Sequence, residues 1–276
     1  MRTTLKLATK LYKEKYSNTG VFISKARAQS FFDEVLGLAF PEIGQHIYKN
    51  EDELYFDLAK SQQELNFILR SINPDKPAEF LSDVSEEFFE NFGSITDTLT
   101  KDAQFFAQQD PAASLIEEII ICYPGFYAIS AYRIANFFQK RKLAIFPRLI
   151  TELARQKTGI DIHPGAEIGA PFFVDHGTGV VIGETAVIGK NVKVYQGVTL
   201  GALLGTKEET STKKRHPTIE DDVCIYANAS IFGGETVVGK GSIIGGNVVL
   251  TESVPPYSQI YFSQDKIIKS MAAPAP

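Results

Sequence analysis

The residue best suited to proton transfer in this 276-residue chain is His176. It directly follows Asp175 and is flanked by Gly177 and Gly179, so the backbone around it can approach a ligand closely. The imidazole group titrates close to neutral pH, and a carboxylate on its other ring nitrogen would fix the tautomer and stabilise the imidazolium. These residues predict acid–base chemistry centred on His176.

A metal site is the alternative, because Asp161 and His163 could cluster with Asp175 and His176. No two of these histidines keep a metal-ligand spacing, and no cysteine joins them. We therefore expect no metal. His163 follows an aliphatic position closely, which favours a structural role at a corner, and His46 lies in a helical segment and needs no chemical role.

The stretch that must position these residues, 159–201, has an aliphatic residue at every sixth position. A period of six fits neither a helix face nor simple strand alternation, and it is typical of a hexapeptide parallel β-helix. The aliphatic positions are Ile162, Ile168 and Val174 and, after a two-residue slip, Ile182, Ile188, Val194 and Leu200. The slip falls beside Asp175 and His176, and a break in a regular solenoid is where a site is expected.

A polar stretch at 202–217 interrupts the repeat, and we expect it to leave the solenoid as an exposed excursion loop. The period then resumes without a slip at Ile219, Ile225, Ile231, Val237, Ile243 and Val249. Val254-Pro255-Pro256 should end it, since prolines cannot donate ladder hydrogen bonds. The last residues of the chain are expected to be disordered.

Residues 1–158 have apolar residues at three- and four-residue spacing, which predicts a helical domain of six or seven helices. The predicted breaks between helices include Gly93 and the pair Asp110-Pro111. Asp110 stands where an N-cap would, with Pro111 at the first helical position, where its missing N–H is harmless.

Composition excludes several classes of protein. A formal net charge of −5 argues against a nucleic-acid binder, and no apolar run approaches the roughly 18 residues of a membrane span. The N-terminus lacks the apolar segment of a secretion signal. The two cysteines, Cys122 and Cys224, lie far apart and suggest neither a disulfide framework nor a zinc site, so a cytoplasmic protein is the simplest interpretation.

Several motifs around the candidate residues occur together. They are DIHPGAEIG at 161–169, DHGTGVVIGETAVIG at 175–189, GVTLG at 197–201 and RHP at 215–217, with DPAAS and YRIANFF in the helical part. The combination closely resembles serine O-acetyltransferase, the first committed enzyme of cysteine biosynthesis, over about residues 110–256. The resemblance implies an α+β chain, with an all-helical domain at 1–158, a left-handed parallel β-helix of hexapeptide repeats at 159–256, and a C-terminal tail at 257–276.

The resemblance also implies roles for individual residues. His176 looks like the general base that takes the proton from the serine hydroxyl, and Asp161 matches its carboxylate partner. The residues that would hold the amine and carboxylate of serine are Asp110, Asp175, Arg215 and His216. Such a set suits a zwitterion, because carboxylates pair with an ammonium and a guanidinium can grip a carboxylate with two bonds.

Acetyl-CoA is then the co-substrate, with no tightly bound cofactor. It should lie along the outside of the solenoid between neighbouring chains of a trimer or a dimer of trimers, with Ala202, Ala227 and Gly245 as backbone contacts and Lys266 near a CoA phosphate. The family usually has two adjacent glycines where Gly201 precedes Ala202. Its usual G-x-P-A-K/R segment is replaced here by FSQDK.

Further partners follow from the same resemblance. Cysteine is expected to inhibit in the serine site. A stable complex with O-acetylserine sulfhydrylase is not expected, because the chain ends in Pro276 where docking members have isoleucine. The alternatives are a hexapeptide acyltransferase for another small hydroxyl acceptor, such as homoserine or a sugar, and a non-enzymatic or γ-carbonic-anhydrase-like β-helix, which would need a histidine trio.

Overall fold

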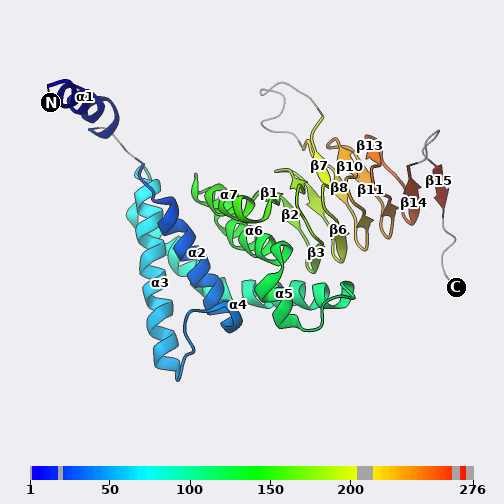
Figure 1. Cartoon of the computed structure of the whole chain (residues 1–276), viewed down its shortest axis with the longest axis horizontal. Helices are drawn as coiled ribbons and strands as arrows, with labels where there is room; N and C mark the ends of the chain where they lie inside the picture. The colour runs from blue at the N-terminus through cyan, green and yellow to red at the C-terminus, as the bar shows by residue number, and fades with distance from the viewer. Residues whose placement is uncertain (1, 18–20, 204–213, 263–267, 272–276) are drawn as a thin grey trace.

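The computed structural model describes residues 2–17, 21–203, 214–262 and 268–271. Helices form the N-terminal part of the chain, and short strands stacked along the long axis form the C-terminal part (Figure 1). The helices of the described residues are α1 (Arg2–Leu11), α2 (Lys25–Ala39), α3 (Glu51–Ile72), α4 (Ala78–Gln109), α5 (Ile116–Cys122), α6 (Pro124–Lys140) and α7 (Phe146–Thr158), with a π-helical turn η1 (Tyr12–Tyr16) and a 3₁₀ turn η2 (Pro41–Ile43). No described helix is long and apolar enough to cross a membrane.

Phenylalanines hold the helices together. Phe31 of α2, Phe88 of α4, Phe138 of α6 and Phe146 of α7 are all fully buried. The rings of Phe88 and Phe138 stack with centroids 5.0 Å apart, and Phe31 and Phe146 meet at 6.0 Å. Such aromatic pairs add to the stabilisation from burial, so four helices distant in sequence share one core.

Gly93 does not break a helix, contrary to our prediction, because α4 continues through it from Ala78 to Gln109. A glycine inside a helix costs only about 1 kcal/mol relative to alanine. Burial of a large apolar side chain contributes about 1.5–3 kcal/mol, and α4 buries Phe88, Phe92 and Leu99 among others. The packed face therefore outweighs the local preference of one exposed glycine.

The predicted helix start at Asp110 is also wrong. Asp110 ends α4, its N–H donating to the Phe106 carbonyl at 2.9 Å, and Pro111 lies in a turn before α5. The Asp110 carboxylate still accepts an N–H bond from Ala112 at 2.8 Å. Aspartate makes the same kind of bond in a local turn as in a helix cap, so the sequence pattern could not separate the two.

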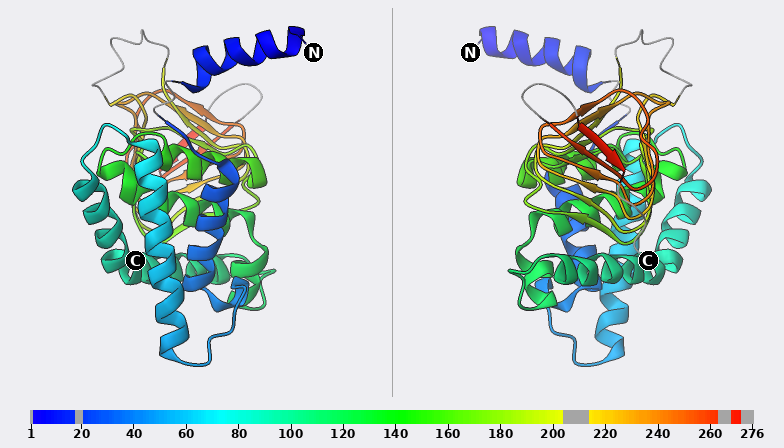
Figure 2. Two further views of the ribbon diagram at one scale, coloured as in Figure 1. Left: turned by 90° about the vertical axis from the view of Figure 1, so that its left-hand side faces the viewer. Right: turned by 90° about the vertical axis from the view of Figure 1, so that its right-hand side faces the viewer.

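The strands wind into a parallel solenoid of three sheets, seen end-on in Figure 2. Sheet A contains β1 (Asp161–Ile162), β4 (Val181–Ile182), β7 (Thr199–Gly201), β10 (Ser230–Phe232) and β13 (Val249–Leu250). Sheet B contains β2 (Glu167–Ile168), β5 (Val187–Ile188), β8 (Thr218–Ile219) and β11 (Val237–Val238). Sheet C contains β3 (Phe172–Val174), β6 (Val192–Val194), β9 (Cys224–Ile225), β12 (Ile243–Ile244), β14 (Ser258–Tyr261) and β15 (Ile268–Met271).

The first aliphatic ladder points inward as predicted, and all seven of its residues are buried. The second ladder is correct only as far as Ile231. Beyond it the inward residues are Val238, Ile244 and Leu250, whereas the predicted Val249 is 55% exposed. Gly233 and Gly234 make the corner after β10 one residue longer than the six-residue repeat. The sequence does not reveal this shift, because each of the next three strands has two adjacent aliphatic residues and either of them fits a spacing of six.

Pro255 and Pro256 do not end the solenoid, contrary to our prediction. Val254 bridges to Val238, and β14 then pairs in parallel with β12. The antiparallel strand β15 adds to the edge of β14. Proline needs only a position without a ladder hydrogen bond, and the corner between two strands supplies one.

A buried ion pair joins the helices to the first coil of the solenoid. Arg133 of α6 donates to both carboxylate oxygens of Asp102 of α4, at 2.8 and 3.0 Å, and both side chains are almost fully buried. Arg133 also donates to the carbonyls of Ile168 and Gly169, while Asp102 accepts the Phe172 N–H at 2.9 Å. The strand that leads to His176 is therefore anchored to two helices.

Candidate active site

His176 occupies a left-handed corner between β3 and β4. Its φ is 54°, and Gly177 follows with a φ of 76°. Other corners hold Asn191, Asp222, Asn228, Asn247 and Tyr257 in the same left-handed conformation. Histidine, like asparagine and aspartate, adopts this conformation more readily than most residues. The turn projects the imidazole outward, where it is 72% exposed and 3.7 Å from the Asp175 carboxylate.

Asp110 and Tyr123 approach the same corner from the helical part. The Tyr123 hydroxyl donates to Asp110 at 2.6 Å, and this bond, followed by the N–H of Ala112, lowers the pKa of Asp110. The charge of His176 lowers the pKa of Asp110 further. The bond to Asp110 and burial, with a smaller effect of the charge of Asp175, raise the pKa of Tyr123 to about 12. We call Asp110, Tyr123, Asp175 and His176 the first cluster. It sets a base beside two carboxylates.

Asp161 and His163 lie elsewhere, on sheet A and at the corner after it. Asp161 is ion-paired with two arginines of α7, Arg148 at 3.2 Å and Arg155 at 3.3 Å. His163 is half-buried, which lowers its pKa, and its Nδ1 accepts the N–H of Gly165 at 3.0 Å. A neutral ring that accepts a backbone bond agrees with the structural role predicted for His163.

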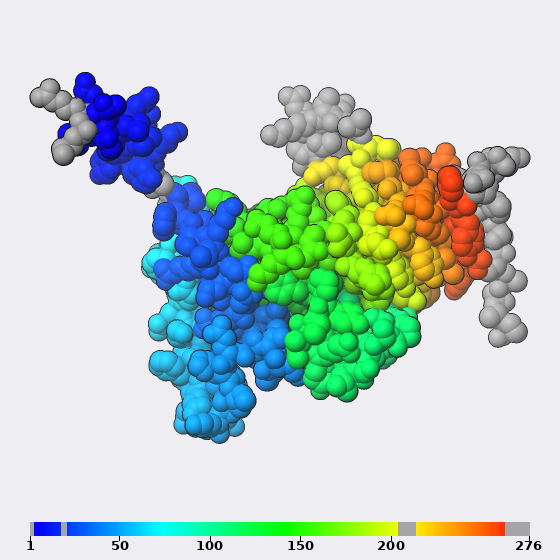
Figure 3. All heavy atoms as spheres, in the orientation of Figure 1, coloured from blue at the N-terminus to red at the C-terminus, as the bar shows by residue number. Residues whose placement is uncertain are grey.

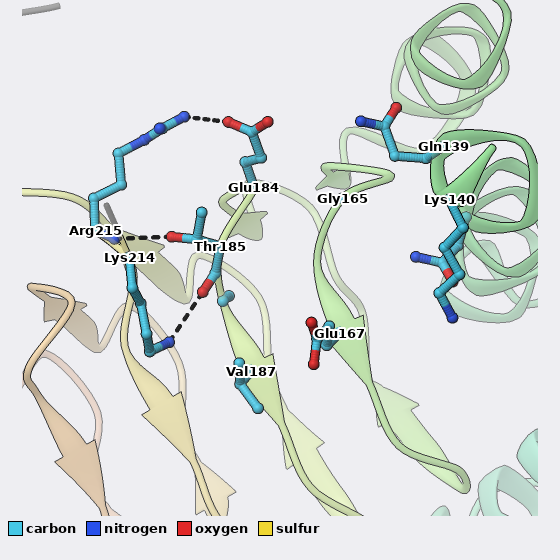
Figure 4. A pocket seen from close by; sticks show the side chains of 11 residues that line it. Gln139, Lys140, Gly165, Glu167, Glu184, Thr185, Val187, Lys214 and Arg215 are labelled. Atoms are coloured by element: carbon cyan, nitrogen blue, oxygen red, sulfur yellow. Dashed lines mark hydrogen bonds and ion pairs between the residues drawn. The ribbon is translucent and has the colours of Figure 1, made fainter. Parts of the chain in front are cut away.

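Arg215 and His216 lie at the corner of Asp161 and His163. The Arg215 guanidinium pairs with Glu184, and the Arg215 N–H donates to Thr185 Oγ1 at 2.9 Å (Figure 4). His216 is 7% exposed, and burial, with a smaller effect of Arg215, lowers its pKa to about 4. The neutral His216 accepts the Thr185 N–H at its Nδ1, which leaves Nε2 as the ring nitrogen that donates.

Gly183 is required by the ring of His216. A Cβ at position 183 would lie 2.0 Å from two of the ring atoms, so only glycine leaves space for the imidazole. We call Asp161, Glu184, Arg215 and His216 the second cluster. Beside the carboxylates of Asp161 and Glu184, it offers a neutral imidazole and a guanidinium, a group that the first cluster lacks.

The two clusters occupy different corners of one chain. The first lies where sheet C turns into sheet A, and the second lies along sheet A and where it turns into sheet B. The structure thus brings Asp110, Asp175 and His176 together, and it separately groups Asp161, Arg215 and His216. A cavity of about 480 Å³ adjoins the second cluster and is lined by Glu184, Thr185, Lys214 and Arg215 together with the end of α6 (Figure 4).

The residues predicted to contact CoA are divided between the same two corners. Ala227 and Gly245 lie on the corner of His176, one and two coils beyond β6. Ala202 directly follows β7, on the corner of the second cluster. A side chain at 245 would meet Tyr261 at 2.9 Å, so the close packing of Tyr261 against this corner requires glycine. Lys266 and the chain end at 272–276 lie outside the described residues.

Three residues at these corners had no predicted role. Glu184 and Thr185 belong to the GETA motif, whose position beside the aliphatic ladder could have indicated them. Tyr123 has no such signal, because it lies in a helix junction without a repeat. Within the described residues, no group of three or more His, Cys, Asp or Glu side chains could hold a metal.

A helical domain on a left-handed β-helix is the architecture of the hexapeptide-repeat class, and in this chain a histidine and a carboxylate lie at an irregular corner of the β-helix. No family model matches the chain. The chain is 51% identical over 162 residues to serine acetyltransferase of Bacillus subtilis, spanning 72% of that protein. It is 48% identical over 191 residues to the plasmid serine acetyltransferase of Synechococcus elongatus, of which it spans 60%. The chain belongs to the serine acetyltransferase family.

Solved structures agree with this assignment. Serine acetyltransferase 1 of Entamoeba histolytica, in complex with L-cysteine, superposes with a TM-score of 0.77 at 33% identity, covering 88% of this chain and 87% of that one. A serine acetyltransferase in complex with CoA has a TM-score of 0.59 at 30% identity and coverages of 89% and 100%. The Neisseria gonorrhoeae enzyme in complex with serine has a TM-score of 0.59 at 26% identity and coverages of 91% and 99%.

Proposed function

We propose that this chain transfers the acetyl group of acetyl-CoA to the hydroxyl of L-serine, making O-acetyl-L-serine for cysteine biosynthesis. The observation that carries the proposal is the first cluster, in which an exposed imidazole stands beside two carboxylates. His176 supplies the base, and Asp110 and Asp175 supply charge for an ammonium group. An acceptor without an amine, such as a sugar, would leave both carboxylates without a role.

The reaction proceeds by direct attack. His176 takes the proton of the serine hydroxyl as that oxygen adds to the thioester carbonyl of acetyl-CoA. The tetrahedral intermediate expels the CoA thiolate, which takes the proton back from the imidazolium. The proton of the serine hydroxyl thus leaves with the CoA thiol, and no acyl-enzyme is needed.

We further propose that three chains assemble around their solenoids, so that the second cluster of one chain faces the first cluster of its neighbour. Arg215 and His216 would then hold the serine carboxylate opposite Asp110 and Asp175. Asp161 of the neighbour would face His176 as its carboxylate partner. Acetyl-CoA would lie between the chains, against Ala202 of one and Ala227 and Gly245 of the other. Cysteine, which differs from serine in one atom, would compete for the same groups.

An assay of CoA release tests the activity. The purified protein is offered acetyl-CoA with serine, homoserine or a hexose. We expect turnover with serine to exceed that with a hexose by at least about a hundredfold, because a site built for charged groups rejects acceptors that lack them. Homoserine keeps both charged groups and adds one methylene, so its turnover should be lower than that of serine by about 10- to 200-fold. Equal turnover with homoserine would favour the alternative acceptor.

Mixed assemblies test the shared site. His176→Ala and Arg215→Ala chains are each expected to be nearly inactive, but chains unfolded and refolded together at a 1:1 ratio should regain roughly a quarter of the wild-type sites, as random assembly of a cyclic trimer predicts. An active site built within one chain would regain none, which would refute the shared arrangement while leaving the activity itself unaffected.

A further inference from the structure

The corner between β7 and β8 is longer than the corners of the neighbouring coils, because residues 202–217 lie between the two strands. The equivalent corner of the preceding coil is closed by its own backbone, with the Ala186 N–H donating to the Gly183 carbonyl at 3.1 Å. The coils stay in contact across the long corner, with β5 paired to β8 and β7 to β10, and they follow one another along the molecule in Figure 3. Arg215 and His216 therefore lie in a segment that no short turn of this kind positions.

Thr185, on the preceding coil, holds this segment through its hydroxyl group. Its Oγ1 accepts the N–H of Arg215 at 2.9 Å and the N–H of His216 at 3.1 Å. Because both lone pairs are used, the hydroxyl hydrogen is directed to Nδ1 of His216, which is 2.9 Å away. The Thr185 N–H reaches the same ring nitrogen at 3.1 Å, so the ring proton lies on Nε2. One side chain thus sets the backbone of both residues and the tautomer of the imidazole.

Lys214 ties the same two parts of the chain together through its ammonium group. Its Nζ donates to the carbonyls of Thr185 at 3.0 Å, His216 at 2.9 Å and Pro217 at 3.4 Å (Figure 4). Partial burial lowers the pKa of Lys214, and the charge of Glu167 raises it. Since the three acceptors come from two separate segments, the ammonium joins the corner at Thr185 to the segment 214–217.

The following coil fixes the segment from its other side. A Cβ at Gly234 would lie 2.0 Å from the Lys214 carbonyl oxygen and 3.0 Å from the Cα of Arg215. The main chain at 214–215 therefore packs directly against the backbone of Gly234, and only glycine leaves room for it. The segment lies between this backbone and the hydrogen bonds of Thr185.

We propose that Thr185 and Lys214 are positioning residues, which hold Arg215 and His216 in the geometry that binds the carboxylate of the acceptor. The inference rests on the proposed function, in which this pair binds the carboxylate of L-serine. The Thr185 hydroxyl makes three bonds within the chain, and the three N–H groups of the Lys214 ammonium meet three carbonyls. Neither group has a bond left for the acceptor, so both act through Arg215 and His216.

Thr185→Val and Thr185→Ser separate the hydroxyl from the shape of the side chain. Valine keeps the shape but leaves two N–H groups and Nδ1 of His216 without their hydroxyl partner. We expect the KM for L-serine to rise at least about tenfold in Thr185→Val, and the KM for acetyl-CoA to change less than about twofold. Thr185→Ser keeps the hydroxyl, and its KM for L-serine should stay within about threefold of the wild type.

Lys214→Ala tests the ammonium by chemical rescue. The truncation removes three methylenes and the ammonium, a fragment that corresponds to propylammonium. The cavity of about 480 Å³ that Lys214 and Thr185 line gives this ion access to the three carbonyls. We expect the KM for L-serine to rise at least about tenfold, and propylammonium chloride to restore it with saturation. Tetramethylammonium chloride at the same concentration has no N–H to donate and should not restore it.

Thr96→Val and Lys60→Ala are the matched controls. Thr96 donates to the Phe92 carbonyl at 3.0 Å, and Lys60 pairs with Glu34 at 3.8 Å, both in the helical part and outside the two clusters. Their KM values should equal those of the wild type with and without propylammonium. Gel filtration checks that every variant assembles. If Lys214→Ala does not assemble, Lys214→Met, which keeps most of the aliphatic stem, is measured in its place and should show the same rise in KM.

The results separate failure of this inference from failure of the proposed function. A wild type that is inactive with L-serine would refute the proposed function and the inference with it. With an active wild type, an unchanged KM for L-serine in Thr185→Val or in the Lys214 variant would overturn the inference alone. So would an equal rise in both KM values, a Thr185→Ser variant as impaired as Thr185→Val, or rescue of Lys214→Ala that tetramethylammonium reproduces or propylammonium does not give.

Discussion

Tyr123→Phe removes one hydroxyl and should weaken serine binding while leaving acetyl-CoA binding intact. The hydroxyl is 2.6 Å from the Asp110 carboxylate, whose other oxygen is held by the Ala112 N–H. Together these two bonds fix the plane of the carboxylate toward the corner of His176. Without the hydroxyl, Asp110 can rotate away from the position proposed for the serine ammonium.

The size of the effect follows from the hydrogen bond. A bond to a charged group contributes about 1.5–3 kcal/mol, and the lower end applies because Asp110 is only half-buried. A loss of about 1.4 kcal/mol is a factor of ten, so the KM for serine should rise about tenfold. The KM for acetyl-CoA should change less than about twofold, since Tyr123 is assigned no part in holding the cofactor.

The pH dependence adds a second readout. The Tyr123 bond is the largest cause of the lowered pKa of Asp110. A lowered carboxyl pKa keeps the group ionised to more acidic pH, so serine binding is lost only as pH falls through that lowered value. In Tyr123→Phe the pKa of Asp110 rises toward its ordinary value, so serine binding measured at equilibrium should be lost at a higher pH than in the wild type.

Tyr48→Phe is the matched control. Tyr48 donates to Asp57 at 2.9 Å, so the variant removes the same type of bond in the helical part, away from both clusters. We expect steady-state constants like those of the wild type. If Tyr123→Phe also leaves the KM for serine and the pH profile unchanged, Asp110 is not oriented by Tyr123, and the reasoning fails.

Three further outcomes are expected. Gly183→Ala should displace the ring of His216, because the added Cβ would lie 2.0 Å from it. The KM for serine in the CoA-release assay should then rise at least about tenfold, and an unchanged KM would show that His216 does not contact serine. His176→Ala should lower kcat at least about a hundredfold with the assembly intact by gel filtration, and near-normal turnover would exclude it as the base. Asp102→Ala should destabilise the fold by about 3–5 kcal/mol in urea, because it leaves Arg133 as an uncompensated buried charge, and a loss below 1 kcal/mol would contradict that account.

The solenoid could be predicted because its repeat is imposed by geometry. Every coil must place one side chain of each strand in the shared core, and this requirement produces the regular spacing of the aliphatic residues. The prediction failed after Ile231, where neighbouring aliphatic residues offered two equally good ladders. Only the extra corner residue at Gly233 and Gly234 decides between them, and a corner insertion leaves the hydrophobic pattern unchanged.

The candidate site was less predictable, because its parts lie in different kinds of structure. His176 and Asp175 stand at a visible break in the repeat. Asp110 was placed at the start of a helix, since a turn and a cap use the same bond, whereas it ends α4. Nothing in the sequence indicated a role for Tyr123. Its hydrogen-bond partner, Asp110, is thirteen residues away on the other side of a short helix, and sequence patterns do not predict how that helix packs.

The position of Asp110 explains why the site needs the helices as well as the solenoid. A hexapeptide coil has few outward positions near a corner, and at the corner of His176 the neighbouring positions are glycines required by the left-handed turn. A second carboxylate beside the base must therefore come from another element. The end of α4 provides it, held by Tyr123 and anchored to the first coil through the buried pair of Asp102 and Arg133. The irregular corner and the helix junction thus form one structural unit, and a change that loosens either one should act on the other.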